Sequence, residues 1–93
     1  MSSITHESFL KEIIEEQHRL QEESLPAHQT ALMAYEIAYT LTDMTMYDSQ
    51  ANIQQYIANH FHLDGERIET VSSFLWNLCR KCIENEKERI VHL

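Results

Sequence analysis

The chain has 93 residues, a hydrophobic content of 43% and a formal net charge of −8, with 7 basic against 15 acidic residues. This size and apolar content fit one globular domain, residues 1–93, and argue against a disordered chain. The acidic balance argues against non-specific binding to nucleic acid or anionic membranes, because such binding draws its affinity from positive side chains beside phosphates.

The first residues lack the basic and then apolar pattern of a signal peptide. The longest apolar stretch, residues 31–46, is interrupted by two acids and is too short to span a bilayer. Two cysteines fit a reducing compartment, where thiols serve as small buried side chains. We therefore expect a cytoplasmic protein that does not cross a membrane.

Glycine and proline each occur once. Folds rich in strands and turns need both residues at tight corners, because glycine reaches positive φ and proline presets a turn. Long segments instead carry apolar residues three and four positions apart, which is typical of amphipathic helices. The sequence therefore predicts an all-α protein, a small four-helix bundle that is up-and-down or a close variant.

The first predicted helix covers about residues 5–23, with Thr5 as its N-cap. One face is apolar. The opposite face is acidic and solvated, and it contains Glu12, Glu15, Glu16, Arg19, Glu22 and Glu23. Such a face is suited to meeting a basic partner, because complementary charge speeds encounter.

The second predicted helix covers about residues 26–46, with Ser24 close to its cap and Pro26 in its first turn. Small apolar residues follow one stripe, large ones lie beside it, and only a narrow stripe is polar. A helix that is apolar around most of its girth usually lies at the centre of its bundle or in a dimer. This pattern predicts a homodimer.

A third helix is predicted over about residues 49–62, capped by Asp48 or Ser49, and a fourth over about residues 65–90, capped by Asp64. The apolar arc of the fourth helix covers more than half of its circumference in its first half. We therefore expect that helix to touch two neighbours.

Cys79 and Cys82 form a CxxC pair, and His60 and His62 could join them as metal ligands. A thioredoxin-type pair opens a helix after a strand, whereas this pair falls in the middle of a predicted helix. Reduced core thiols are the favoured interpretation, so no metal or cofactor is expected. A metal or redox protein using Cys79 and Cys82 remains an alternative.

Residues 53–78 have the outline of a helix-turn-helix, a short helix followed by a tight joint and a second helix. The first turn of the second helix would carry Asp64, Glu66 and Glu69 against the single base Arg67. These acids would repel phosphates, so nucleic acid is not the favoured partner. A DNA-binding regulator is the second hypothesis.

No arrangement of residues specifies a catalytic chemistry, and the sequence does not predict an enzyme. The leading hypothesis is an acidic helical protein-interaction module, a small regulator, adaptor, chaperone or antagonist that docks helices on a protein partner of unknown identity. Tyrosine and methionine are favoured at interface centres. The candidate residues for a partner or dimer interface are Tyr35, Tyr39, Met44, Met46 and Tyr47.

Overall fold

The structure, a computed structural model, describes residues 5–41 and 44–91 of the chain, with side chains as far as residue 85. These ranges hold the helices α1 His6–Glu23, α2 Leu25–Thr40, α3 Gln50–His60 and α4 Gly65–Val91, and the short 3-10 helix η1 Met44–Asp48. Neither range contains a strand. The prediction of an all-α protein with four helices is confirmed.

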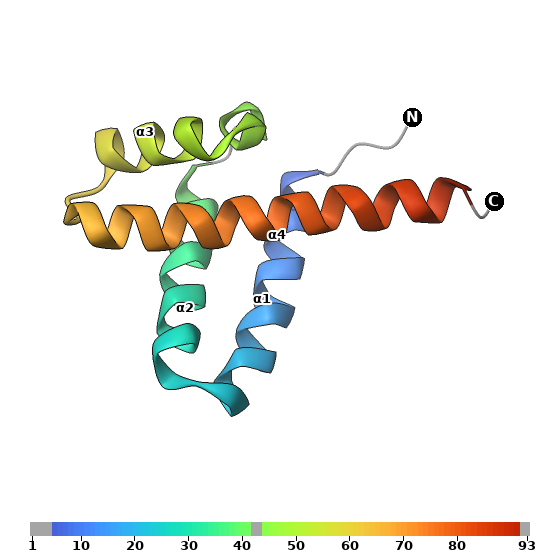
Figure 1. Ribbon diagram of the computed structural model, residues 1–93, viewed down its shortest axis with the longest axis horizontal. Coiled ribbons are helices and arrows are strands. Elements are labelled where there is room, and N and C mark those ends of the chain that lie inside the picture. The colour runs from blue at the N-terminus through green and yellow to red at the C-terminus, as the bar shows by residue number, and fades with distance from the viewer. Residues whose placement is uncertain (1–4, 42–43, 92–93) are drawn as a thin grey trace.

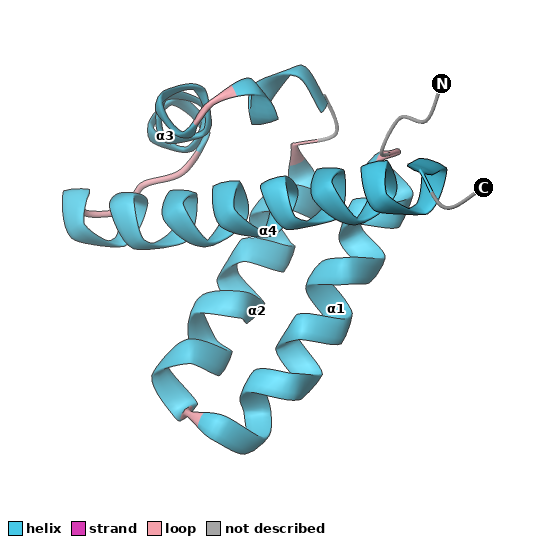
Figure 2. Ribbon diagram, turned by 45° about the vertical axis from the view of Figure 1, so that its right-hand side comes forward, coloured by secondary structure: helices cyan, strands magenta, loops and turns pink. Residues whose placement is uncertain are grey.

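Helices α1 and α2 form an antiparallel hairpin, and α4 runs between this hairpin and α3 (Figure 1). The second view shows the same order, with α3 crossing α4 rather than lying alongside it (Figure 2). Helix α4 packs against each of the other three helices and against η1. The four helices therefore form a variant of the four-helix bundle in which α4 passes across the hairpin.

Side-chain caps begin all four helices at residues that the sequence predicts. Ser24 alone separates α1 from α2, and it serves both: its N–H donates to the Leu20 carbonyl, and its side chain accepts from the N–H of Ala27. In the other three caps, a side-chain oxygen accepts from the backbone N–H three residues later. The pairs are Thr5 with Ser8 at 3.1 Å, Ser49 with Asn52 at 3.1 Å and Asp64 with Arg67 at 2.7 Å. Each satisfies a backbone N–H of the first turn that has no partner within the helix.

Helix α2 ends earlier than the sequence predicts. The predicted end is Met46, but the helix stops at Thr40, and Leu41 is extended with φ −94° and ψ 96°. The early end lets η1 turn back over the core, where the Tyr47 ring meets the Phe9 ring edge-on at a centroid distance of 4.7 Å. Burial of Leu41, Met46 and Tyr47 is the tertiary gain that overrides the helical pattern of this segment.

The core lies where α4 meets the hairpin and η1. Phe9, Ile13 and Leu75 are fully buried there. The small-residue stripe predicted on α2 is also buried, because Ala31, Ala34 and Ala38 have no exposed surface. Small side chains at these positions let α1 and α2 approach closely.

Tyr47 offers a test of this core. Its ring is 3% exposed, its hydroxyl has no hydrogen-bond partner among the described residues, and burial raises the pKa of its phenol. We expect Tyr47→Ala to lower the free energy of unfolding by about 3–5 kcal/mol, because it removes a large buried ring. Tyr47→Phe keeps the ring, and urea denaturation should show a change within about 1 kcal/mol. Equal losses in the two variants would contradict this placement.

Gly65 offers a second test. It is the first residue of α4, its φ is not positive, and a Cβ atom built there meets nothing within 4 Å. Gly65→Ala should therefore raise the free energy of unfolding by about 0.4–1 kcal/mol, because alanine has fewer conformations to lose on folding. A drop in the thermal midpoint of this variant would mean that the joint before α4 needs the freedom of glycine.

Candidate functional site

The exposed apolar side chains of the hairpin gather on one of its faces. Leu25, Leu32 and Tyr39 on α2 are 67%, 38% and 65% exposed. Positions seven residues apart are two turns apart and return to nearly the same side of a helix. Ile14 on α1, which is 37% exposed, adds to the same face. We call this the outer face, and its members are Leu10, Ile14, Leu25, Leu32, Tyr35 and Tyr39.

The pairing of the two helices brings these residues together. Nδ1 of His28 on α2 lies 3.1 Å from the carbonyl oxygen of Gln17 on α1. In an antiparallel pair, residue numbers that add to the same sum lie at the same level, and this contact sets the sum at about 45. Leu10 is then level with Tyr35, and Ile14 is level with the turn that carries Leu32.

Helix α4 covers the opposite side of the hairpin. Gln29 and Met33 of α2 line a groove together with Arg67 of α4. On α1, the Glu16 carboxylate is close enough to Lys81 of α4 for the lysine to lower the pKa of that carboxyl. At 100° per residue, Met33 lies about 100° from Leu32 and Glu16 lies about 160° from Ile14, whereas Gln29 lies at the edge of the outer face. The outer face is therefore the side that α4 leaves uncovered, as the position of α4 in front of the hairpin indicates (Figure 1).

A hollow adjoins the outer face on α1. It is open to solvent, has a volume of about 530 Å³ and is lined by Thr5, Glu7, Ser8, Leu10, Lys11 and Ile14. Leu10 and Ile14 are its apolar members, while Glu7 and Lys11 are its charged members. Tyr39 stands exposed at a similar level on α2, and its ring lies 6.1 Å from the Tyr35 ring. The face thus combines a projecting aromatic side chain with a recess.

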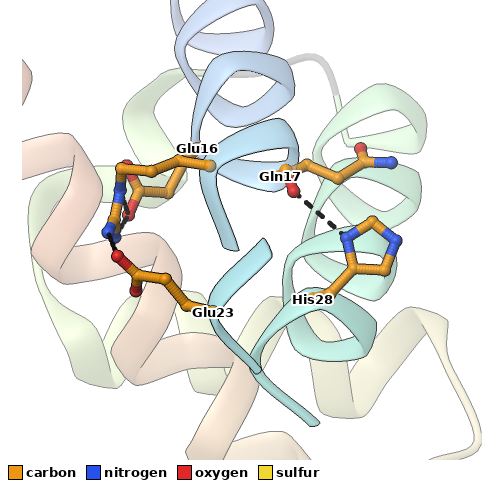
Figure 3. A network of polar contacts seen from close by, with 5 residues as sticks. Glu16, Gln17, Glu23 and His28 are labelled. Carbon is orange, nitrogen blue, oxygen red and sulfur yellow. Dashed lines mark hydrogen bonds and ion pairs between the residues drawn. The ribbon is translucent and has the colours of Figure 1, made fainter. Parts of the chain in front are cut away.

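The acidic side of α1 is partly neutralised by one arginine. Arg19 forms ion pairs with Glu16 and with Glu23, the second at 2.7 Å. The hydrogen bond from the guanidinium is the main cause that lowers the pKa of Glu16. Figure 3 shows Glu16 and Glu23 on one side of α1 and Gln17 with His28 on the other. The charged network and the outer face therefore occupy different sides of the same helix.

The structure divides the five interface candidates chosen from the sequence. Tyr39 is exposed, and Tyr35 and Met44 are half-buried. Met46 and Tyr47 are buried in the core, so they offer no surface to a partner in this fold. Sequence reasoning did not single out Leu25, Leu32, Leu10 or Ile14 as contact residues. The seven-residue spacing of Leu25, Leu32 and Tyr39 is the signal that could have found three members of this face.

The two thiols lie on α4. Cys79 is buried and Cys82 is half-buried, and neither forms a disulfide. Burial raises the pKa of the Cys79 thiol, and burial aided by the negative charge of Glu12 raises the pKa of the Cys82 thiol to about 11. Both thiols therefore stay protonated at neutral pH. A redox nucleophile or a metal ligand acts as a thiolate, so this environment disfavours either role.

His60 is not near the thiols. Its Nδ1 lies 2.9 Å from the Tyr56 carbonyl oxygen, and its ring stacks on the Tyr56 ring at the end of α3. Cys82 is seventeen residues into α4, or about 25 Å along the helix from Gly65. Within the described part of the chain, no three His, Cys, Asp or Glu residues form a group that could hold a metal ion.

The helix-turn-helix outline corresponds to α3, a joint over residues 61–64 and α4. Asp64, Glu66 and Glu69 are all exposed at the start of α4, and Arg67 is the base among them. The same end of α4 borders the groove of about 590 Å³ shared with α2, whose lining is mostly polar and carries both charges. Asp64, Glu66 and Glu69, the acids that would repel phosphates, are thus exposed to solvent.

Comparisons with known proteins add no relative. No model of a known protein family, no curated protein and no solved structure matches this chain. Across residues 5–41 and 44–91, no helix combines the length and apolar content needed to cross a membrane.

Ionisation of the thiols should lower the free energy of unfolding as the pH rises into the alkaline range. Because folding raises the pKa of Cys82 from 9.0 to about 11, the unfolded chain loses this proton first as the pH rises. The free energy of unfolding should hold below pH 9 and fall between about pH 9 and 11. Cys82→Ala should make that fall shallower, by less than the roughly 1.4 kcal/mol per pH unit of a fully coupled group, since the thiol is partly exposed.

Urea denaturation at pH 8, 9 and 10 measures this slope in the wild type and in Cys82→Ala. Asn77→Ala, at an exposed position of the same helix, is the control and should keep the wild-type slope. An unchanged slope in Cys82→Ala would contradict the raised pKa.

Proposed function

We propose that this protein is a non-enzymatic interaction module, a small regulator, adaptor, chaperone or antagonist that docks the outer face of its hairpin on a helical surface of a protein partner. The observation that carries the proposal is the exposure of Leu25, Leu32 and Tyr39 along one side of α2. A run of apolar side chains at this spacing on a helix is the pattern of a helix–helix seam.

The composition of the outer face supports the same function. Contiguous exposed apolar surface on a small domain typically marks an interaction site, because its burial removes apolar area from water. Tyrosine adds contact area with little loss of side-chain freedom, and Tyr35 and Tyr39 are neighbours on this face. The acidic side of α1 adds long-range attraction toward a basic partner without occupying the contact surface.

The setting that we propose is the cytoplasm. Its support is the pair of free cysteines, both with raised pKa values, which suits a reducing compartment in which thiols serve as packing groups. The DNA-binding and the metal or redox alternatives have less support. The exposed acids at the start of α4 disfavour the first, and the separation of His60 from Cys82 disfavours the second.

A matched pair of variants tests the contact surface. Leu32 and Ile83 are both 38% exposed, but Leu32 lies on the outer face and Ile83 lies on α4. We expect Leu32→Lys to reduce the recovery of specific partners at least tenfold in affinity capture from cells of the source organism, because it buries a charge in the contact. Ile83→Lys should retain wild-type recovery.

Circular dichroism and thermal melting should first show that both variants keep the helical fold. Quantitative mass spectrometry of the captured proteins, with untagged copies of this chain counted separately, then gives the readout. Equal recovery by the two variants, or a loss confined to Ile83→Lys, would refute the outer face as the contact surface.

A further inference from the structure

We infer that the outer face is covered by a second copy of this chain, in a two-fold dimer in which each α1 lies antiparallel on the α2 of its partner. The inference rests on the proposed function, because it names the occupant of the same face. Such a dimer joins two helical hairpins into a four-helix layer. The local two-fold axis runs along the hairpin and leaves each residue at its own level, so that residues of the two copies whose numbers add to about 45 meet.

The shapes of the two helices fit this arrangement. At a sum of about 45, Tyr39 is level with position 6 of α1, between Thr5 and Glu7. The exposed Tyr39 ring of one copy therefore comes level with the end of the hollow that Thr5 and Glu7 line on the other copy. Symmetry makes the same contact twice. A projecting ring and a recess on one surface are the self-complementary features that a two-fold interface requires.

The charges fit as well. The numbers of Lys11 and Glu36 add to 47, which places them within two residues, or about 3 Å along the helix, of the same level. Both are exposed, and both lie on the edge of the outer face away from the other helix of the hairpin. In the dimer, Lys11 of each copy meets Glu36 of the other. Glu7, a charged residue of the adjoining hollow, comes level with the uncharged residues Ala38 and Tyr39.

The net charge explains why this face, rather than another, joins two identical copies. Two chains of charge −8 repel each other, so their contact must avoid the acidic side of α1. The hollow and the edges of the outer face carry the base Lys11 and the acids Glu7 and Glu36, and the two-fold arrangement pairs the base with Glu36. The hairpin is about 25 Å long and about 20 Å wide. This area is at the low end for specific interfaces, so we expect a dissociation constant in the micromolar range.

Charge reversal tests the dimer directly by sedimentation velocity across a concentration series. Lys11→Glu changes the net charge of each copy from −8 to −10, and Glu36→Lys changes it to −6. Each should raise the dissociation constant of the dimer about tenfold, because each places two pairs of like charges next to each other across the interface. The double variant restores both pairs and the net charge of −8, and it should return to within about threefold of the wild type.

The Glu36→Lys variant carries the most information. A smaller net charge by itself strengthens self-association. A weaker dimer of this variant, whose net charge is −6, can therefore only come from the repulsion of like charges at the interface. Glu84→Lys, which makes the same change of net charge at an exposed position on α4, is the matched control and should dimerise at least as well as the wild type.

The outcomes separate this inference from the proposed function. A wild-type chain that stays monomeric at about 200 µM, or a dimer in which Lys11→Glu and Glu36→Lys match the control, overturns the inference. If Leu32→Lys still loses its captured partners in that case, the outer face remains the contact surface for another protein. A concentration-dependent dimer with weakening by both single variants and recovery in the double variant supports the inference.

Discussion

Ser24 sets the geometry on which the rest of this fold depends. As the only residue between α1 and α2, it completes the last turn of one helix with its N–H and caps the next with its side chain. A connection of one residue holds the two helices antiparallel and in contact along their length. Pro26 strengthens the reversal because its missing N–H costs nothing in the first turn of a helix. The hairpin is then a two-helix layer with two broad sides, and the remaining elements pack on one of them.

One long helix covers that side. Helix α4 contacts both helices of the hairpin as well as α3 and η1, and the buried residues Phe9, Ile13 and Leu75 lie where these elements meet. A single helix that crosses a two-helix layer buries one of its sides and leaves the other open. The outer face is therefore a consequence of the whole arrangement, because no other described element is placed to cover Leu32 or Tyr39.

Local chemistry made much of this fold predictable. Single glycine and proline residues, together with caps at Thr5, Ser24 and Asp64, predict the number of helices and most of their ends. The end of α2 was not predictable, because its apolar pattern continues through Met46 while the chain breaks at Leu41. The cause is a contact between Tyr47 and Phe9, nearly forty residues apart in the sequence, and no local pattern records it.

The candidate site was predictable only in part, for a related reason. Periodicity tells which residues share a side of a helix, but it does not tell which neighbour covers that side. Helix α2 is apolar almost all round, and α1 and α4 cover two of its sides. Met46 and Tyr47 belong to the segment that folds back into the core, whereas Leu25, Leu32 and Tyr39 lie on the third side. A domain of this size gives α2 too few neighbours, and the apolar surface left over is the basis of the proposed contact.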